Sequence, residues 1–298
     1  MVEITLKRFD KIRFVNVLFI TFLFLSSKDL IAQKNQNIFD NAAWKTEFIA
    51  KDVTHFHHHF EQDSIFNSKQ NIHYIKIKLS KAKKSLAIAR ADSGMILTSI
   101  LARKSDAIAA INGSFFNTKT GASVNFIKIN GQVIDTTFYD DKQKELKANQ
   151  QGVLVFDSTG IEIISRNFED KYWWLSSLNY ENALESGPLL IKDNIPKIPA
   201  DTPFSKNRHP RSAVCLTDDA LILLTADGRN TNSYGLSIDE LTQMLTWLNC
   251  KDALNLDGGG STTLFIKQYG VVNMPSDNKL WDHEGERAVN NALWLMQN

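Results

Sequence analysis

The stretch Ala253-Leu-Asn-Leu-Asp-Gly-Gly-Gly-Ser-Thr-Thr-Leu-Phe-Ile266 is the part of the sequence around which the rest of the chain is expected to be arranged. Apolar residues at both ends predict two short buried strands, and the three glycines between them predict a loop. Glycine permits close approach of a ligand to the main chain, and successive N–H groups can form an anion-binding concavity. Asp257 precedes the glycines and three hydroxyl residues follow them. The stretch therefore indicates either an anionic substrate beside a carboxylate or simply a tight turn.

Other apolar strands also end in polar residues. Residues 107–111 lead to Asn112-Gly113, and residues 221–226 lead to Asp227-Gly-Arg229. Polar groups delivered by several strand ends of one sheet would gather at one rim. Residues 237–249 have the spacing of an amphipathic helix, with a capping box from Ser237 to Glu240. We therefore expect an α+β fold: a single domain with a mixed, mainly antiparallel sheet and few helices.

The charge balance argues against nucleic acid as a partner. The 298-residue chain carries a formal net charge of +1. Without residues 1–32, it has 29 Lys and Arg against 30 Asp and Glu, a net charge of −1. A near-neutral protein without basic runs lacks the electrostatic footprint of a nucleic-acid-binding surface.

The N-terminus is typical of a secretory signal peptide. Four basic residues between positions 7 and 13 precede an apolar run over residues 14–25. This run is shorter than the roughly 20 apolar residues of a membrane span. We predict residues 1–32 as a signal peptide cleaved after Ala32, with an uncleaved anchor as the alternative. The protein is then exported, periplasmic or extracellular, with no membrane span after cleavage.

Residues 33–84 are predicted to contain a strand pair, residues 53–60 and 72–79, separated by the polar stretch 61–71. The first strand carries His55, His57, His58 and His59. On a strand, three of these histidines share one face and could bind a transition metal. The interpretation favoured here is a polar strand face, because no carboxylate or cysteine nearby in the sequence completes a metal site.

Three further features allow alternatives. Cys215 and Cys250 lie in apolar surroundings and are expected to be buried free thiols, although export permits a disulfide. The aromatic cluster Tyr172-Trp-Trp174 is either core or a sugar-stacking surface. The proline-containing segment 196–207 is expected to be extended and could form a lid.

Several segments, in this order, resemble the phosphodiester glycosidase family. The resemblance covers roughly residue 85 to the C-terminus, with residues 33–84 matching less well. The segments that carry it are Asn112-Gly-Ser-Phe-Phe116, Glu185-Ser-Gly-Pro-Leu-Leu-Ile191, His209-Pro-Arg-Ser-Ala213, Asp227-Gly-Arg229, Gly235-Leu-Ser-Ile-Asp-Glu-Leu241, Asn255-Leu-Asp-Gly-Gly-Gly-Ser-Thr-Thr263, Asn273-Met-Pro-Ser-Asp277 and Gly285-Glu-Arg-Ala-Val289. Ser212, where the family more often has Thr, is a small departure. We therefore predict that residues 85–298 form a phosphodiester glycosidase domain.

The resemblance implies an exported hydrolase that cleaves a sugar-1-phosphodiester at the anomeric carbon. It would release an N-acetylglucosamine-like sugar and a phosphomonoester. The residues predicted to be catalytic are Asp257, Glu185, Asp227 and Asn112. Asp257 and Glu185 are candidates for nucleophile or general base. Asn112, Asp227 and His209 would orient the sugar or a water.

The substrate-binding prediction centres on the phosphate. Arg211 and Arg287 would hold it, because guanidinium groups match phosphate in a bidentate manner. The full predicted set is Arg211, His209, Gly258, Gly259, Gly260, Ser261, Thr262, Arg229, Glu286 and Arg287. No cofactor is predicted, and a divalent metal requirement and the oligomeric state are left open. The alternatives are a metal-dependent phosphodiesterase that attacks phosphorus and a non-catalytic module that binds envelope polysaccharide.

Overall fold

The computed structural model describes residues 27–92, 94–137, 142, 145–166, 169 and 178–297. Helix α1 (Ser27–Asp40) belongs to a unit separate from residues 42–298. The predicted cleavage point after Ala32 lies within this helix, and the predicted basic and apolar parts of the signal lie outside the described residues. Tyr172, Trp173 and Trp174 also lie outside them. Among the described residues, no helix has both the length and the apolar character needed to cross a membrane.

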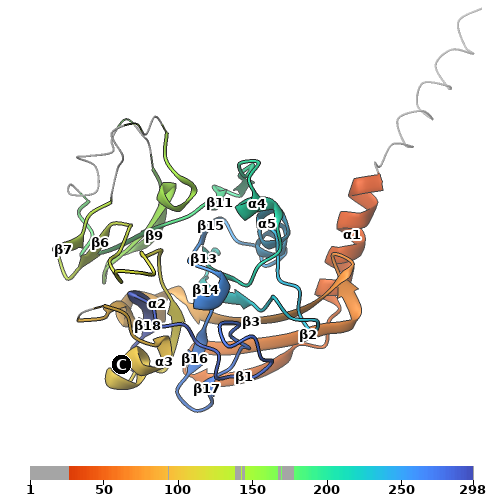
Figure 1. Ribbon diagram of the computed structural model, residues 1–298, viewed down its shortest axis with the longest axis horizontal. Coiled ribbons are helices and arrows are strands. Elements are labelled where there is room, and N and C mark those ends of the chain that lie inside the picture. Colours follow the sequence, from red (N-terminus) through yellow and green to blue (C-terminus); the bar gives the residue numbers. More distant parts are fainter. Residues whose placement is uncertain are drawn as a thin grey trace, which may run out of the picture. The chain divides into compact units, whose positions relative to one another are not determined.

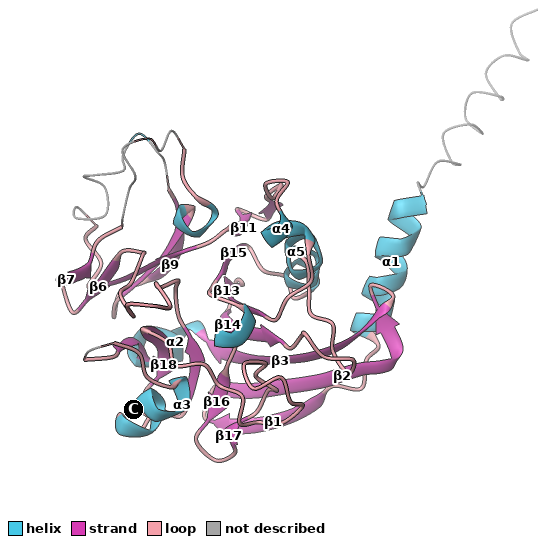
Figure 2. Ribbon diagram, viewed as in Figure 1, coloured by secondary structure: helices cyan, strands magenta, loops and turns pink. Residues whose placement is uncertain are grey.

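The larger unit is built from three sheets, and strands dominate its ribbon (Figures 1 and 2). Its largest sheet has eight strands in the order β1-β2-β3-β14-β13-β15-β11-β12. Their bounds are β1 (Lys45–Ala50), β2 (Val53–Ile65), β3 (Ser68–Lys78), β11 (Leu189–Lys192), β12 (Ile195–Pro196), β13 (Arg211–Leu216), β14 (Ala220–Ala226) and β15 (Asp252–Asn255).

Two five-stranded sheets complete the fold. One has the order β7-β6-β10-β8-β9, with bounds β6 (Ile127–Ile129), β7 (Gln132–Asp135), β8 (Gly152–Phe156), β9 (Ile161–Ser165) and β10 (Asn182–Ser186). The other has the order β17-β16-β5-β18-β4, with bounds β4 (Leu86–Arg90), β5 (Ala109–Asn112), β16 (Leu264–Ile266), β17 (Gly270–Val271) and β18 (Asn291–Leu295).

The helices of this unit are short. They are α2 (Leu79–Ser85), α3 (Thr98–Lys104), α4 (Pro203–Lys206) and α5 (Ile238–Trp247), with 3₁₀ turns η1 (Ala148–Gln150) and η3 (Gly259–Ser261). In α5 the predicted capping box is present: the Ser237 hydroxyl accepts from the Glu240 N–H, and the Glu240 carboxylate accepts from the Ser237 N–H at 2.9 Å. All strand pairings described are antiparallel. The α+β class with few helices is thus confirmed.

One hydrophobic core joins all three sheets. Buried aliphatic side chains meet there from the large sheet, such as Ile75 and Leu254, and from the two smaller sheets, such as Ile111 and Leu154. Because the core holds strands of different sheets together, the polar residues at their ends are fixed relative to one another. Burial on this scale is the main favourable term in folding.

The hairpin of β2 and β3 is longer than predicted. The polar stretch 61–71 was expected to separate the two strands, and this was wrong. The strands continue to Ile65 and from Ser68, and only Phe66 and Asn67 turn, at φ of 54° and 52°. Two consecutive residues at positive φ make a tight hairpin turn that usually contains glycine. Phe-Asn does not carry that signal, whereas the predicted Asn130-Gly131 hairpin does and is confirmed by β6 and β7.

The expectation of two free thiols was also wrong, because Cys215 and Cys250 form a disulfide. Cys215 lies in β13, and the Lys251 N–H donates to the carbonyl of Leu216 at 2.7 Å. This bond brings the chain after α5 alongside β13, so the two cysteine Cα atoms lie 5.7 Å apart. Sequence alone does not reveal this proximity.

We predict that the disulfide contributes measurably to stability. It closes a loop with a sequence separation of 35 residues, so chain-entropy arguments give about 3–4 kcal/mol. A Cys215→Ala/Cys250→Ala variant should lose about this free energy of unfolding in urea denaturation under oxidising conditions. Dithiothreitol should lower the wild-type midpoint and leave that of the variant unchanged. Equal midpoints for wild type and variant without reductant would contradict the prediction.

Candidate active site

Asp257 lies where the chain crosses from one sheet to another. Strand β15 of the large sheet ends at Asn255, and β16 of a smaller sheet begins at Leu264. The Asp257 N–H donates to the carbonyl of Gly113 at 2.9 Å, and the buried Asn112 amide donates to the Asp257 carbonyl at 2.6 Å. Main-chain contacts to the end of β5 therefore fix the backbone of Asp257.

Asn112 holds both ends of the glycine loop. Besides its bond to Asp257, its side-chain oxygen accepts from the Thr263 N–H at 3.1 Å and from the Ser212 hydroxyl at 2.6 Å. The residue predicted as catalytic thus has a positioning role, with its amide group fully used by the protein. The predicted gathering of strand ends at one place is present here.

The three glycines lie close to neighbouring groups, and a Cβ on Gly258 would lie 2.7 Å from the carbonyl oxygen of Pro210. Gly259 has φ of +62°, which favours glycine, and a Cβ there would lie 2.8 Å from Nη2 of Arg229. A Cβ on Gly260 would lie 2.5 Å from Nη2 of Arg287. Two guanidinium groups therefore lie against the bare main chain of this loop.

The N–H groups of the loop are used differently from the prediction. The Gly258 N–H donates to the Asp257 carboxylate at 2.9 Å, and the Gly259 N–H donates to the carbonyl of Pro210 at 2.8 Å. Two of the three predicted phosphate donors are therefore engaged within the protein. Positive charge next to the loop comes instead from Arg229, which is exposed, and Arg287.

The Asp257 carboxyl group is partly buried, and its environment favours the protonated form. Burial raises the pKa of Asp257 to about 6, opposed by the Ser261 hydroxyl, the Gly258 N–H and the positive charges of Arg287 and Arg229. Desolvation penalises the charged carboxylate, and the neighbouring cations only partly offset that penalty. A carboxyl group with a pKa near 6 can exchange a proton in the neutral range.

Asp227 is fully buried, and its carboxylate accepts three hydrogen bonds. Its carboxylate accepts from the side chains of Asn71 and Asn273, each at 2.8 Å, and from the Met274 N–H at 2.9 Å. Burial raises its pKa, and these bonds lower it. Asn273 also donates to the carbonyl of Thr262 at 3.1 Å, so Asp227 is connected to the end of the glycine loop. This geometry gives Asp227 a positioning role.

Arg211 is placed as an anchor of the main chain. Its guanidinium group is 1% exposed and donates to the carbonyls of Leu236, Phe204 and Asn207 at 2.7–3.1 Å. Its Cζ also lies 4.7 Å from the centroid of the Phe204 ring. These contacts fasten α4 and the end of the proline-containing segment that was considered as a lid. The predicted phosphate role of Arg211 stays a prediction that these contacts do not favour.

Glu185 is likewise committed to the protein. Its carboxylate, fully buried in β10, forms an ion pair with Arg166 and accepts from Thr137. It also accepts from the side chain of Asn125 at 3.2 Å and the Phe126 N–H at 3.0 Å. None of these contacts belongs to the glycine loop. Breaking a buried ion pair of this kind is strongly destabilising, and the catalytic role of Glu185 stays a prediction that these contacts do not favour.

The remaining predicted residues lie either at the glycine loop and Arg229 or away from them. His209 lies near Arg229, and burial followed by the charges of Arg211 and Arg229 lowers its pKa. Ser261 and Thr262 are buried in the loop itself. Glu286 instead accepts from the Ser99 N–H at 3.0 Å in the first turn of α3, away from the loop contacts described above.

The structure adds residues that the site prediction missed. Asp277 binds Arg287 at 2.5 and 3.1 Å beside Gly260, and Asn273 and Asn71 hold Asp227. Asn273 and Asp277 lie in a segment that carries the family resemblance, which was the available signal. Asn71 had none, because its strand had been read as a loop.

The predicted histidine face exists. His55, His57 and His59 line one pocket together with His73, whereas the ring of His58 lies 5.7 Å from that of Trp44 on the other face of β2. Among the described residues, no group of three or more side chains of the metal-binding types converges on one point.

Comparisons with known proteins show what this chain is similar to. A profile of the family described as phosphodiester glycosidase matches residues 105–296. A prophage-derived uncharacterised protein of Bacillus subtilis is 26% identical over 198 residues, which cover 65% of this chain and 29% of that protein. The chain thus spans less than a third of the length of that relative.

Solved structures share the fold. The catalytic domain of zebrafish N-acetylglucosamine-1-phosphodiester alpha-N-acetylglucosaminidase, auto-inhibited by its pro-peptide, is similar with a TM-score of 0.64 at 19% identity, covering 88% of this chain and 93% of that one. A hypothetical Synechocystis protein is similar with a TM-score of 0.61 at 18% identity, covering 86% and 64%. A Burkholderia pseudomallei protein described as exported has a TM-score of 0.56 at 15% identity, covering 78% and 75%.

We predict that Asp257→Asn stabilises the protein at neutral pH. The folded-state pKa of Asp257 is raised, so wild-type stability falls as pH rises from about 4 to about 6 and the ionised carboxylate remains costly above that. With a discount for its partial exposure, the variant should gain roughly 1–2 kcal/mol at pH 7.5 and nothing at pH 4. Urea denaturation at the two pH values measures this difference.

A matched control is Asp218→Asn, which changes an exposed carboxylate paired with Lys251. Its effect on the free energy of unfolding should be small at both pH values, because exposed ion pairs contribute little. If Asp257→Asn were less stable than the wild type at pH 7.5, the assigned electrostatics of the site would be wrong.

Proposed function

The chain belongs to the phosphodiester glycosidase family, and on this premise we propose that it hydrolyses a sugar-1-phosphodiester at the anomeric carbon. The products are a free sugar, of the N-acetylglucosamine type, and a phosphomonoester. The zebrafish relative, an N-acetylglucosamine-1-phosphodiester alpha-N-acetylglucosaminidase, has the same fold and supports this assignment. Because the likeness is distant in sequence, the particular sugar and the group beyond the phosphate are part of the proposal.

The observation that carries the proposal is the pairing of one carboxylate with two guanidinium groups around a bare loop. Asp257 has a pKa of about 6, and both Arg229 and Arg287 act on its charge. Both guanidinium groups approach the glycines so closely that a Cβ would not fit. A phosphodiester requires cations on its phosphate, and its anomeric carbon requires a carboxylate.

The bond changes follow from these positions. The anomeric C–O bond breaks, and the phosphomonoester leaves with both electrons of that bond. Positive charge develops on the sugar ring, and the carboxylate of Asp257 stabilises it by covalent attack or by taking a proton from the attacking water. Both routes require the ionised form. A phosphate leaves readily as an anion, so the cations replace a strong general acid.

Arg229 and Arg287 are the proposed phosphate ligands. Arg287 is held by Asp277 at the glycine loop, and Arg229 extends into solvent beside Gly259. Arg211 is the poorer candidate, because three main-chain carbonyls already accept from it. Asn112 and Asp227 act as positioning residues for the loop.

Export is also part of the proposal. The Cys215–Cys250 disulfide forms and persists best in an oxidising compartment. The N-terminal pattern of basic and apolar residues and the exported Burkholderia relative agree with it. We place the protein in the periplasm or outside the cell.

The site of bond cleavage tests this function. A panel of glycosyl-1-phosphodiesters incubated in ¹⁸O-labelled water should yield labelled sugar and unlabelled phosphomonoester, as read by mass spectrometry. Asp257→Asn should lower turnover about a thousandfold or more, because removal of an essential carboxylate removes transition-state stabilisation. Label in the phosphomonoester would mean attack on phosphorus and would overturn the proposal.

The arginine assignments make a second prediction. Arg229→Gln and Arg287→Gln should each lower kcat/KM by about 10- to 100-fold, the effect of losing one charge-assisted contact, with little change in the urea midpoint. Arg211→Lys should instead lower the midpoint, because lysine cannot reproduce the planar set of donors to three carbonyls. A normal midpoint with a large loss of kcat/KM in Arg211→Lys would restore Arg211 as a phosphate ligand.

A further inference from the structure

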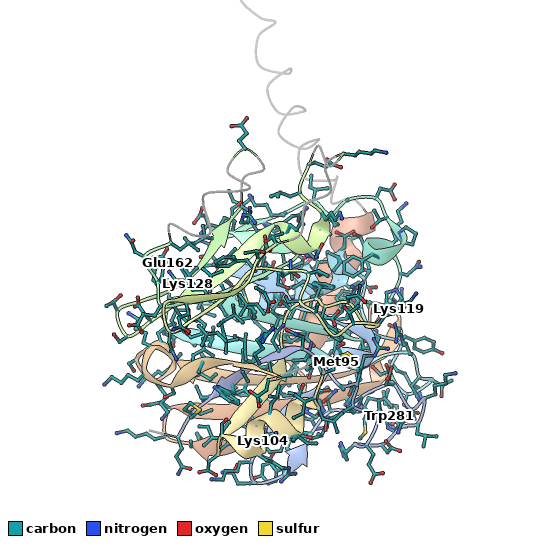
Figure 3. All side chains as sticks on the ribbon, turned by 60° about the vertical axis from the view of Figure 1, so that its left-hand side comes forward. Met95, Lys104, Lys119, Lys128, Glu162 and Trp281 are labelled. Atoms are coloured by element: carbon teal, nitrogen blue, oxygen red, sulfur yellow. A yellow bond between two sulfur atoms is a disulfide. The ribbon has the colours of Figure 1, made fainter. Side chains whose placement is uncertain are left out.

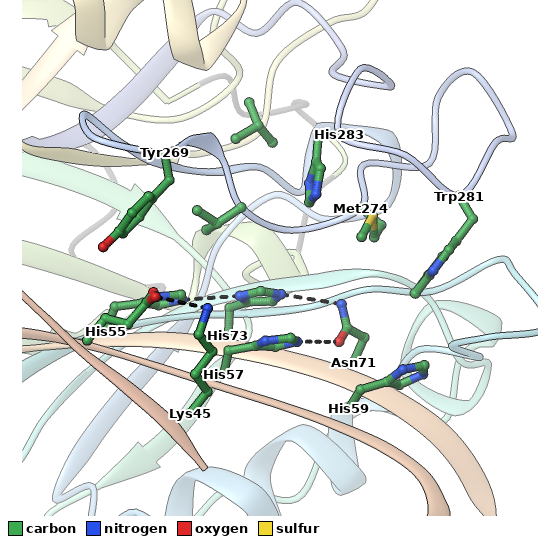
Figure 4. A pocket seen from close by; sticks show the side chains of 13 residues that line it. Lys45, His55, His57, His59, Asn71, His73, Tyr269, Met274, Trp281 and His283 are labelled. Atoms are coloured by element: carbon green, nitrogen blue, oxygen red, sulfur yellow. Dashed lines mark hydrogen bonds and ion pairs between the residues drawn. The ribbon is translucent and has the colours of Figure 1, made fainter.

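A pocket lined by Asn71 and Met274 lies next to Asp227, to which both residues donate. Its volume is about 400 Å³, within the range of small-molecule sites. Figure 4 shows a floor of histidines and Asn71 from β2 and β3, facing a roof that includes Tyr269, Met274, Trp281 and His283. The floor comes from residues outside the range 105–296 that matches the family, whereas the roof lies within that range.

The floor is a row of parallel rings. His57 and His73 stack with centroids 4.0 Å apart, and His55 and His73 with centroids 5.4 Å apart, both at 6°. They belong to neighbouring strands in which His57 lies directly opposite His73. Alternation along each strand brings these side chains to one face.

Hydrogen bonds determine the charge of this floor. Asn71 donates to Asp227, so its amide nitrogen also donates to Nε2 of His73, at 3.3 Å, and its oxygen accepts from His57 at 2.8 Å. Nδ1 of His73 then donates to Nε2 of His55 at 3.1 Å, and Nδ1 of His55 donates to Glu47 at 3.2 Å. His55 and His73 thus each have one donor and one acceptor nitrogen, which is the neutral tautomer, and His57 donates through Nε2.

The protonation of the floor follows the same pattern. Burial lowers the pKa of His55, His57 and His73, and the effect is strongest for His73. The pKa of His73 is lowered further by the neighbouring histidines His57, His55, His283 and His59. Glu47 favours the charged form of His55, and Lys45 opposes it. At neutral pH the rings of His55, His57 and His73 are therefore uncharged, and the floor that they form is polar.

The roof has the opposite character. Val271, Val272 and Met274 supply apolar surface, and the aromatic rings of Tyr269 and Trp281 extend it. Tyr269 is 54% exposed, and the Trp281 ring lies 5.9 Å from that of His59. Figure 3 shows Trp281 at the edge of the molecule, so the pocket can be reached from solvent. Aromatic rings with one side exposed to solvent are common in ligand and interface sites.

Other ligand classes fit less well. For a metal, no group of three or more side chains of the metal-binding types converges on one point among the described residues. For an anion, the lysine of the pocket, Lys45, is neutralised by Glu47 at 2.9 Å. A neutral ligand with many hydroxyl groups on its edge and an apolar ring face matches both walls.

We propose that this pocket binds a neutral carbohydrate, one or two pyranose rings long, with ring faces against Trp281 and Tyr269 and hydroxyl groups on the histidine floor. The site is separate from the glycine loop, and binding there requires no hydrolysis. Asn71 contacts both the floor and Asp227, so a sugar held here lies next to the hydrogen bonds that connect Asp227 through Asn273 to the glycine loop.

Saturation-transfer NMR on the purified protein tests this. The probes are maltose, cellobiose, mannobiose and N,N′-diacetylchitobiose, and we expect transfer to at least one. Trp281→Ala and Tyr269→Ala should each weaken that binding by about tenfold or more, the effect of truncating a central aromatic contact. Phe48→Ala is the matched control: Phe48 is an 85% exposed aromatic on β1, and adjacent strand residues face opposite sides, so it points away from Glu47 in the pocket.

The possible outcomes separate this proposal from the proposed function. Binding lost in Trp281→Ala but retained in Phe48→Ala and Asp257→Asn supports the pocket, even if no phosphodiester is hydrolysed. Absence of transfer to all four disaccharides overturns the proposal, as does binding unchanged in both aromatic variants. A tight Zn²⁺ titration lost in His57→Ala, without sugar binding, would identify a metal site instead.

Discussion

The constraint on which the site depends is the set of three hydrogen bonds made by the Asn112 side chain. Its amide donates to the carbonyl of Asp257 and accepts from the N–H of Thr263 and the hydroxyl of Ser212. These partners lie at the two ends of the glycine loop and on β13. Because Asn112 is itself at the end of β5, it joins two sheets at the point where the chain crosses between them. A buried polar group with all partners present is rigid, whereas loss of one partner leaves an unpaired group at a cost of about 1–3 kcal/mol.

Rigidity at this crossing explains how the charges can be held together. The loop cannot relax away from Arg229 and Arg287, because bonds to Gly113 and Pro210 fix its backbone. Nor can it carry side chains between the guanidinium groups and the main chain. The result is a carboxylate under a desolvation penalty with cations on its open side, which is the usual electrostatic arrangement of a catalytic group. Stability lost by burying Asp257 is recovered in the three-sheet core rather than at the site.

Sequence patterns predicted what depends on local physics. Strand ends, the Asn130-Gly131 hairpin and the Ser237 capping box follow from spacing and turn chemistry within a few residues. The Phe66-Asn67 turn and the disulfide depend on contacts made far along the chain, and both were missed. The same limit applies to charges. Arg211 and Arg287 look alike in sequence, but Arg211 is buried among three carbonyls, whereas Arg287 is half-buried at the loop and paired with Asp277. Whether a charged residue already has its partners is a property of the tertiary structure.

Asp227 is a charged residue that already has its hydrogen-bond partners within the protein, and it still contributes to the site. It is surrounded by three donors from two segments: the Asn71 side chain of β3, and the Asn273 side chain with the neighbouring Met274 N–H. Asn71 also fixes the tautomers of the histidine floor, and Asn273 also holds Thr262. Because loss of a donor to a buried carboxylate is costly, these hydrogen bonds hold both the histidine floor and the end of the glycine loop, and both depend on the same three amide groups.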